Sequence, residues 1–258
     1  MAGGHSVLAV AFVAAVGLAG CSGSPPLNGA GALGSGVGSS TLTTTAPSSS
    51  FDPFGLDNAD SGYKRRVVIS NPSISQIMKP GPLPEMTLGR ADAPVTIIKY
   101  ASMTCPYCRL FQIKTFPVLK REYIDTGKVR FILREFPIGF QSGAATIALR
   151  CAPPKKYFDL YDKLMRQQRS WVSQDVRRDP IFKVAQQVGL SRSRFDACFA
   201  DKALAAKLKA VKDRGRELGI IGTPNFFVNG ELIKRRLTIT DIHSLVSKAL
   251  AKPVAAAN

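Results

Sequence analysis

The pattern of apolar residues along the chain predicts an α/β domain. Residues 95–100, Val-Thr-Ile-Ile-Lys-Tyr, form a β-branched run of strand length, and residues 128–136 alternate like a second strand. Phe226–Val228 and Leu232–Lys234 flank an Asn-Gly pair, which predicts a β-hairpin. Between the first two strands, apolar residues recur at helical spacing as far as Leu119. The pattern therefore places strands near both ends of the folded part.

Helical periodicity dominates the interval between the second strand and the hairpin. The pattern predicts five helices there and a closing helix near the C-terminus, over Ser142–Arg150, Lys155–Arg169, Ile181–Gly189, Ser191–Ala200, Ala203–Leu218 and Thr240–Ala251.

The N-terminus is typical of an export signal. The apolar run Val7–Leu18 is followed by Ala19-Gly20-Cys21, which resembles the lipobox of bacterial lipoproteins. We therefore expect residues 1–21 to form a signal peptide and Cys21 to carry the lipid. The six residues before the run contain no Lys or Arg, which departs from that pattern, and cleavage by the ordinary signal peptidase is the alternative.

Residues 22–62 have the composition of a flexible linker. Of the 29 residues from 22 to 50, 21 are Ser, Gly, Thr or Pro, and none is charged. Such a segment buries too little apolar surface to offset the entropy lost on ordering. We expect a basic N-terminal arm over 63–85 and a folded domain that begins between Lys64 and Met86.

The charge of the chain is concentrated after this linker. The net charge is +17, Lys64 is the first basic residue, and Asp52, Asp57 and Asp60 are the acids that precede it. Residues 63–258 therefore carry 35 basic residues against 18 − 3 = 15 acidic ones. Such a surface attracts polyanions. No cluster of basic residues interleaved with aromatic residues is evident, however, so we predict no nucleic-acid partner.

The candidate chemistry lies in Cys105-Pro106-Tyr107-Cys108, between the first strand and its helix. Free amides and the helix dipole favour an anion at a helix N-terminus, which lowers the pKa of a cysteine there. Cys105 is therefore the expected nucleophile, and Cys108 the cysteine that resolves the mixed disulfide. Pro106 loses no hydrogen bond at an early helical position, whereas Pro117 should kink the helix.

Half of a zinc site is the main alternative for a Cys-x-x-Cys pair, but it needs two further ligands. Only Cys151 and Cys198 remain in the domain, at spacings unlike those of common zinc motifs, and the chain has only two histidines. We therefore predict no metal and no other cofactor. The shortage of histidine also excludes most Cys/His and Ser/His hydrolases.

Two segments resemble one family. Gly89–Cys108 and Gly222–Gly230 are similar to the matching motifs of DsbA-like thiol–disulfide oxidoreductases of the thioredoxin superfamily, and the likeness covers roughly residues 85–255. It implies an α/β thioredoxin-like core over 86–140 and 219–258, with a helical insertion over 141–218. It further implies that Thr223-Pro224 is a cis peptide facing the dithiol, and that the main chain of Thr223 binds an extended substrate peptide.

The resemblance also bears on the remaining cysteines. Some DsbA-like proteins carry a second disulfide in the helical insertion, and Cys151 and Cys198 both fall there. We expect them to form a structural disulfide, as unpaired cysteines of exported proteins commonly do. A regulatory disulfide or two free buried thiols are the alternatives.

Two residues depart from the family pattern. Tyr107 stands where strongly oxidising members often have His, and Lys99 stands where many members have a buried Glu that relays protons. A lysine beside the dithiol would lower the pKa of the thiolate and make the protein a stronger oxidant. Alternatively, Lys99 lies on the opposite face of the sheet, in solvent.

These features predict a monomeric thiol oxidase of the periplasm or cell envelope, anchored to the membrane through Cys21. Its expected partners are reduced exported proteins and a DsbB-like membrane protein that reoxidises it. A disulfide isomerase or reductase is the first alternative, although isomerases usually need a dimerisation module, which the linker does not offer. A non-catalytic binding lipoprotein with a thioredoxin fold is an alternative from another functional class.

Overall fold

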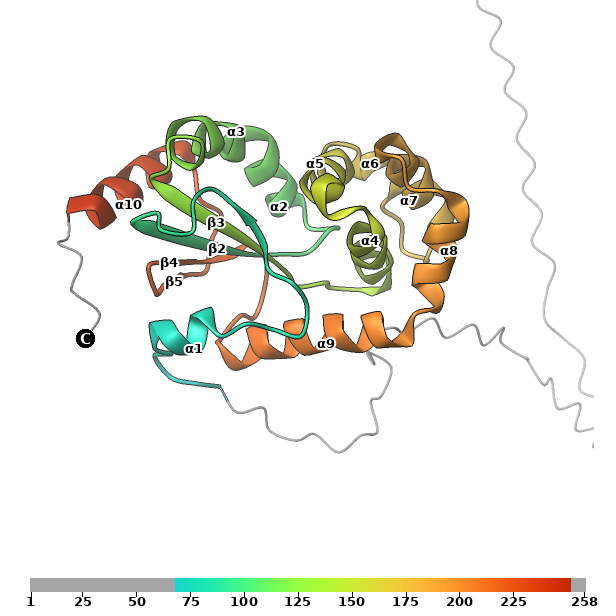
Figure 1. The fold of residues 1–258 in the computed structure, drawn as a ribbon, viewed down its shortest axis with the longest axis horizontal. Helices are drawn as coiled ribbons and strands as arrows, with labels where there is room; N and C mark the ends of the chain where they lie inside the picture. The colour runs from blue at the N-terminus through green and yellow to red at the C-terminus, as the bar shows by residue number, and fades with distance from the viewer. Residues whose placement is uncertain (1–67, 252–258) are drawn as a thin grey trace, which may run out of the picture. The chain divides into compact units, whose positions relative to one another are not determined.

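The strand before the cysteine motif lies at the centre of the sheet. The computed structural model describes residues 68–251, in which five strands are ordered β1-β3-β2-β4-β5 (Figure 1). Strand β2 pairs parallel with β3 and antiparallel with β4, while β1–β3 and β4–β5 are antiparallel. The strands span Met86–Leu88, Val95–Ala101, Val129–Glu135, Asn225–Val228 and Glu231–Ile233.

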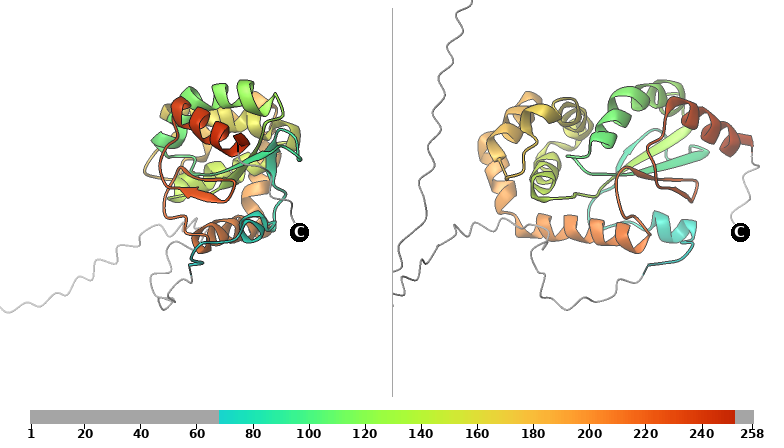
Figure 2. Two further views of the ribbon diagram at one scale, coloured as in Figure 1. Left: turned by 90° about the vertical axis from the view of Figure 1, so that its left-hand side faces the viewer. Right: turned by 180° about the vertical axis from the view of Figure 1, so that it is seen from behind.

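Helices cover both faces of this sheet, which explains why β2 is apolar on both sides. Ile97 and Phe226 belong to the core beneath α2, α3 and α10, whereas Ile98 and Phe227 belong to the core beneath α1 and α9 (Figures 1 and 2). The α-helices span Ile74–Met78 (α1), Pro106–Leu110 (α2), Phe116–Leu119 (α3), Phe140–Cys151 (α4), Tyr157–Arg166 (α5), Gln168–Trp171 (α6), Arg178–Ala185 (α7), Arg192–Ala200 (α8), Lys202–Glu217 (α9) and Ile239–Ala251 (α10).

The helix that carries the cysteine motif is irregular around its proline. Two five-residue π-helical segments, Phe111–Thr115 and Lys120–Ile124, flank α3. The Phe116 amide donates to the carbonyl of Phe111, five residues back, directly before Pro117. Proline has no amide to donate, so the expected disturbance takes the form of a widened turn.

The predicted hairpin forms around its Asn-Gly pair. Asn229 has a φ of 44° and Gly230 a φ of 89°, and Val228 pairs with Glu231 across the turn. Positive φ at both central residues is the geometry that joins two twisted strands with a two-residue loop. The prediction from the sequence is therefore confirmed.

The helical insertion lies beyond one end of the sheet and contains helices α4 to α8 (Figure 1). The predicted helix over Lys155–Arg169 is divided in the structure into a 3₁₀ turn at Pro154–Lys156, α5 and α6. Cys151, the last residue of α4, forms a disulfide with Cys198 in α8, 47 residues further along the chain. This covalent link joins two insertion helices that pack against each other.

The boundaries of the domain parts differ from the expected ones at two places. Helix α9, expected in the insertion, runs back beneath the sheet, where an added Cβ on Gly215 would lie 2.9 Å from the Tyr100 ring. Residues 68–85, expected as part of an arm, contain α1, whose Ile77 is buried against the same face of the sheet. Short amphipathic segments such as α1 give too few periodic positions to be recognised from sequence.

The close approach of α9 to the sheet yields a stability prediction. We expect Gly215→Ala to destabilise the fold by about 1–3 kcal/mol, because the new methyl group would overlap the buried Tyr100 and Phe136 rings. Helix propensity alone would stabilise the variant by about 1 kcal/mol. Ala206→Gly, on an exposed position of the same helix, measures that propensity effect, and urea unfolding of both variants separates the two contributions. A stabilised Gly215→Ala variant would contradict the packing described here.

Candidate active site

The local fold places Cys105 at the N-terminus of α2. After β2, the chain makes a short turn in which the Cys105 amide donates to the Ser102 carbonyl at 3.2 Å. Cys105 has extended backbone angles (φ −71°, ψ 121°) and is the N-cap of α2, and Pro106 takes the first helical position. The Cys108 amide points back and donates to Cys105 Sγ at 3.4 Å.

The loop before β4 brings a second segment to the same sulfur. Thr223-Pro224 is a cis peptide, and the Cys105 thiol donates to the Thr223 carbonyl at 3.1 Å. These residues are 118 positions apart in the chain but meet because β4 pairs with β2. The Thr223 carbonyl therefore lies directly beside the sulfur of Cys105.

The hydrogen bonds that Cys105 Sγ receives favour its thiolate. A hydrogen bond from the Cys108 thiol lowers the pKa of Cys105 most, and burial opposes it. Hydrogen bonds from the Thr223 side chain and from the backbone amides of Cys108 and Tyr107 lower it further, so that the pKa of Cys105 is about 5. Cys105 is therefore an anion at neutral pH in the reduced protein.

The second cysteine has the opposite tendency. Cys108 is fully buried, and burial followed by the hydrogen bond it gives to Cys105 raises its pKa well above the ordinary value. Lys99 acts against this rise. The two sulfurs thus share one negative charge, held on Cys105, which is the arrangement expected of an attacking and a resolving cysteine.

Lys99 lies inside the protein, beneath the dithiol. Its side chain is 0% exposed, so the alternative that places it in solvent is wrong. Lys99 Nζ donates to Tyr161 Oη at 3.0 Å and lies 4.3 Å from the centre of the Phe111 ring. Burial lowers the pKa of Lys99 to about 8, although the charges of Cys108 and Cys105 raise it. Its cation therefore interacts with both sulfurs at neutral pH.

The insertion supports the active-site turn with residues that no sequence motif indicated. Gln168 Nε2 donates to the carbonyls of Met103 at 2.7 Å and Cys105 at 3.2 Å. The Ser142 hydroxyl accepts from the Met103 amide at 3.0 Å and lies 2.8 Å from the Ser102 hydroxyl. Gln168 and Ser142 are ordinary polar residues of helical segments, and only the tertiary fold brings them to the turn.

The remaining candidate residues lie elsewhere. Tyr107 is 59% exposed beside the cysteines, so it is available to a partner protein. The Cys151–Cys198 disulfide belongs to the insertion and is not part of this site. Cys21 lies outside the described residues. Within residues 68–251, no group of three His, Cys, Asp or Glu side chains could hold a metal ion.

Known proteins are similar to this chain in sequence. The family model described as Thioredoxin matches residues 83–248. A Rickettsia bellii relative whose name describes it as a protein-disulfide oxidoreductase is 32% identical over 168 residues, which cover 64% of this chain and 64% of that one. The match thus spans slightly less than two thirds of the relative's length. A Bacillus cereus relative named for disulfide bond formation is 30% identical over 156 residues, covering 57% of this chain and 71% of its own.

Solved structures agree with the family model. Alpha-DsbA1 of Wolbachia pipientis superposes with a TM-score of 0.62 at 28% identity, covering 69% of this chain and 98% of its own. Oxidised BdbD of Bacillus subtilis superposes with a TM-score of 0.61 at 24% identity, covering 72% of this chain and 99% of its own. The predicted thioredoxin-like fold with a DsbA-like helical insertion is confirmed.

The pKa of Cys105 is directly testable. We expect the rate of alkylation of Cys105 by iodoacetamide to stay high from neutral pH down to about pH 5 and to fall below it, because the thiolate then takes up a proton. Cys108→Ser keeps a hydrogen-bond donor and should preserve this profile. Cys108→Ala removes the donor and should move the midpoint to higher pH. Identical midpoints for the two variants would exclude the proposed hydrogen bond.

Lys99 should lower the stability of the reduced fold and, at the same time, stabilise the Cys105 thiolate. In the reduced protein at pH 7, we expect Lys99→Met to raise the free energy of unfolding by about 1–3 kcal/mol. The variant removes a buried charge, and this gain should exceed the cost of leaving the Tyr161 hydroxyl without its partner. Since the pKa of Lys99 is lowered from 10.5 to about 8, the gain should be full below pH 8 and shrink as the pH rises towards 10.5. The alkylation midpoint of Cys105 should rise. Denaturant unfolding and alkylation measure the two effects, and a destabilised variant would contradict the cost assigned to the charge.

Proposed function

This chain belongs to the thioredoxin family, and we propose that it is a thiol–disulfide oxidoreductase of the DsbA type that introduces disulfides into reduced proteins of the cell envelope. The observation that carries the proposal is the unequal ionisation of Cys105 and Cys108. A thiolate with a low pKa is a good leaving group, and its stability in the reduced protein makes the disulfide a strong oxidant.

The proposed reaction consists of two thiol–disulfide exchanges. A client thiolate attacks Sγ of Cys105 in the oxidised protein, the Cys105–Cys108 bond breaks, and Cys108 leaves and takes up a proton. The second client thiolate then attacks the client sulfur of the mixed disulfide and releases Cys105 as a thiolate. The client loses two electrons and two protons; the Cys105–Cys108 pair gains both electrons and one proton, held on Cys108, and the second proton passes to solvent.

The site residues support this direction. The hydrogen bonds at the helix N-terminus and the Lys99 cation both favour the thiolate product. A histidine at the position of Tyr107 is therefore not required for an oxidising dithiol. The elevated pKa of Cys108 limits its attack on the mixed disulfide, so the second client thiol has time to react.

The surface around Cys105 supports a protein client. Five of the exposed large apolar side chains lie on segments next to the dithiol, namely Tyr107, Leu110, Ile138, Val172 and Ile221. Ile221 precedes the cis-proline loop and is 80% exposed, and the Ile138 amide donates to Ser102 in the active-site turn. Apolar surface of this kind fits unfolded polypeptides better than small polar thiols. We call these five residues the client surface.

The proposed location and partners rest on the N-terminal segment and on the need to reoxidise the dithiol. The expected periplasmic or envelope location relies on the signal-like N-terminus and on a lipid at Cys21, which lie outside the described residues. Reoxidation would require a membrane redox protein similar to DsbB. In residues 68–251, no helix is long and apolar enough to cross a membrane.

An isomerase or reductase remains the alternative for the same dithiol, and a binding protein without catalysis is the alternative of another functional class.

The central test is oxidation of a reduced, unfolded protein with several cysteines by one equivalent of the oxidised chain. We expect complete transfer of the disulfide by the wild type and none by Cys105→Ala. Efficient rearrangement of wrongly paired disulfides in a client protein, with weak net oxidation of its thiols, would support an isomerase. Full biological activity of Cys105→Ala would exclude enzymatic function.

The client surface yields a second prediction. We expect Ile221→Asp to lower kcat/KM for an unfolded protein by about tenfold, because an apolar contact worth about 1–2 kcal/mol is lost on binding. Oxidation of dithiothreitol, which is too small to use the surface, should be unchanged. Val68→Asp, at an exposed apolar position near α1, is the matched control and should leave both rates unaltered. Equal losses with both reductants would exclude a role in client binding.

A further inference from the structure

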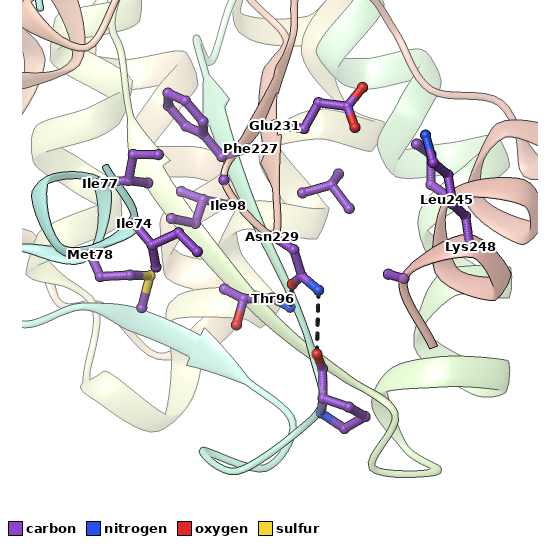
Figure 3. A pocket seen from close by; sticks show the side chains of 14 residues that line it. Ile74, Ile77, Met78, Thr96, Ile98, Phe227, Asn229, Glu231, Leu245 and Lys248 are labelled. Carbon is purple, nitrogen blue, oxygen red and sulfur yellow. Dashed lines mark hydrogen bonds between the residues drawn. The ribbon is translucent and has the colours of Figure 1, made fainter. Parts of the chain in front are cut away.

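A second apolar site lies at the end of the sheet away from the dithiol. A cavity of about 440 Å³ is bordered by α1, the start of β2, the β4–β5 turn and α10 (Figure 3). Pro94 and Thr96 line it at the amino end of β2, whereas Cys105 follows the carboxyl end of that strand. The length of β2 separates the two sites, which is about 20 Å at the rise of an extended strand. We call this cavity the distal groove.

The lining of the distal groove suits apolar side chains. Ile74, Ile77 and Met78 of α1 lie on one side, and Leu245 of α10 lies on the other (Figure 3). The amide side chain of Asn229 at the base is already engaged. Its Oδ1 accepts from the Thr96 amide at 2.7 Å, and its Nδ2 donates to the Pro94 carbonyl at 3.4 Å. The groove therefore offers contact area rather than a polar recognition site.

Apolar side chains also remain exposed around its mouth. Ile74 is 62% exposed and Leu250, next to the lining residue Ala249, is 42% exposed. Contiguous apolar surface of this kind usually marks a place that another segment covers. Lys248 on the rim is exposed, and no ion pair of it is found among residues 68–251. Glu231 also lines the groove, and Lys248 is the basic side chain among the lining residues that an acidic occupant would face.

The chain itself contains a segment of matching chemistry. Residues 51–56, Phe-Asp-Pro-Phe-Gly-Leu, place three large apolar side chains within six positions, after 29 residues without a charge. Asp52, Asp57 and Asp60 are the acids before Lys64, and they all fall in or just after this segment. The segment is thus apolar and acidic, whereas the residues after it have the large basic excess described above.

We propose that residues 51–56 of the same chain occupy the distal groove. Phe51, Phe54 and Leu56 would fill the apolar cavity, and the neighbouring carboxylates would face Lys248. The chain is long enough for this contact, because the 12 Cα–Cα intervals from Leu56 to Val68 can span up to about 40 Å when extended. Val68 lies only six residues before Ile74, which lines the groove.

This contact would cover the apolar end of the domain and leave the client surface free. It would also hold the chain against the domain at residues 51–56, so that the expected linker would leave the domain from there. The proposal does not depend on the direction of the redox reaction. It concerns a surface that the dithiol does not touch.

Photo-crosslinking in the full chain tests the proposal. The photoreactive residue p-benzoylphenylalanine replaces Phe54 in one sample and Leu42 in the control sample, and the products are mapped by mass spectrometry. We expect Phe54→p-benzoylphenylalanine to crosslink within single chains to peptides that contain Ile74–Met78 or Leu245–Ala249. The Leu42 control should give a several-fold lower yield at these peptides.

Two groove variants complete the experiment. Lys248→Glu changes only an exposed rim residue and should lower the crosslink yield about two- to fivefold, as expected for loss of one surface charge pair. Ala249→Trp should fill the groove and abolish the specific crosslink. Equal yields from positions 54 and 42, crosslinks to other parts of the domain, or crosslinks only between two chains would each overturn the proposal. The last result would assign the groove to a second copy of the protein.

Discussion

The need to hold a negative charge on one partly enclosed sulfur organises this structure. Cys105 lies at the N-cap of a short helix, where the Cys108 amide is directed at it. The loop of Thr223 reaches it from the neighbouring strand, and the Lys99 cation lies beneath it. The Cys108 contact is local to α2 and Lys99 lies on β2 itself, whereas the antiparallel pairing of β4 with β2 brings the Thr223 loop to the sulfur. The hydrogen bond from the Cys108 thiol contributes most to lowering the pKa of Cys105 to about 5, and the sheet positions the Thr223 loop beside that sulfur.

Lys99 gives this site a property of its own. A buried cation that contacts no carboxylate of residues 68–251 lowers the stability of the reduced fold, yet it stabilises the thiolate above it. Tyr161 and the Phe111 ring partly replace the lost water, through a hydrogen bond and a cation–π contact. Lys99 therefore lowers the stability of the reduced fold, and we expect it to raise the reduction potential of the Cys105–Cys108 pair.

The sequence was informative where the signal was local. The cysteine motif, the Asn-Gly hairpin around Gly230 and most long helices depend on nearby residues, and their positions were predicted within a few residues. Alternation along β2 could not reveal that Lys99 is buried, because both faces of a central strand are covered. Gln168 reaches the active-site turn from 63 residues away, and no pattern in the chain indicates that contact. The client surface likewise consists of separate segments that only the fold assembles.

The reduction potential of the Cys105–Cys108 pair tests the central claim most directly. It would be measured in glutathione buffers, with alkylated peptides identified by mass so that the Cys151–Cys198 disulfide is scored separately. Known proteins span about −120 mV for a strong periplasmic oxidant to about −270 mV for thioredoxin. A charge-stabilised Cys105 predicts a value near −120 mV, with a lower value in Lys99→Met. A value near −270 mV would contradict the account and indicate a reductase.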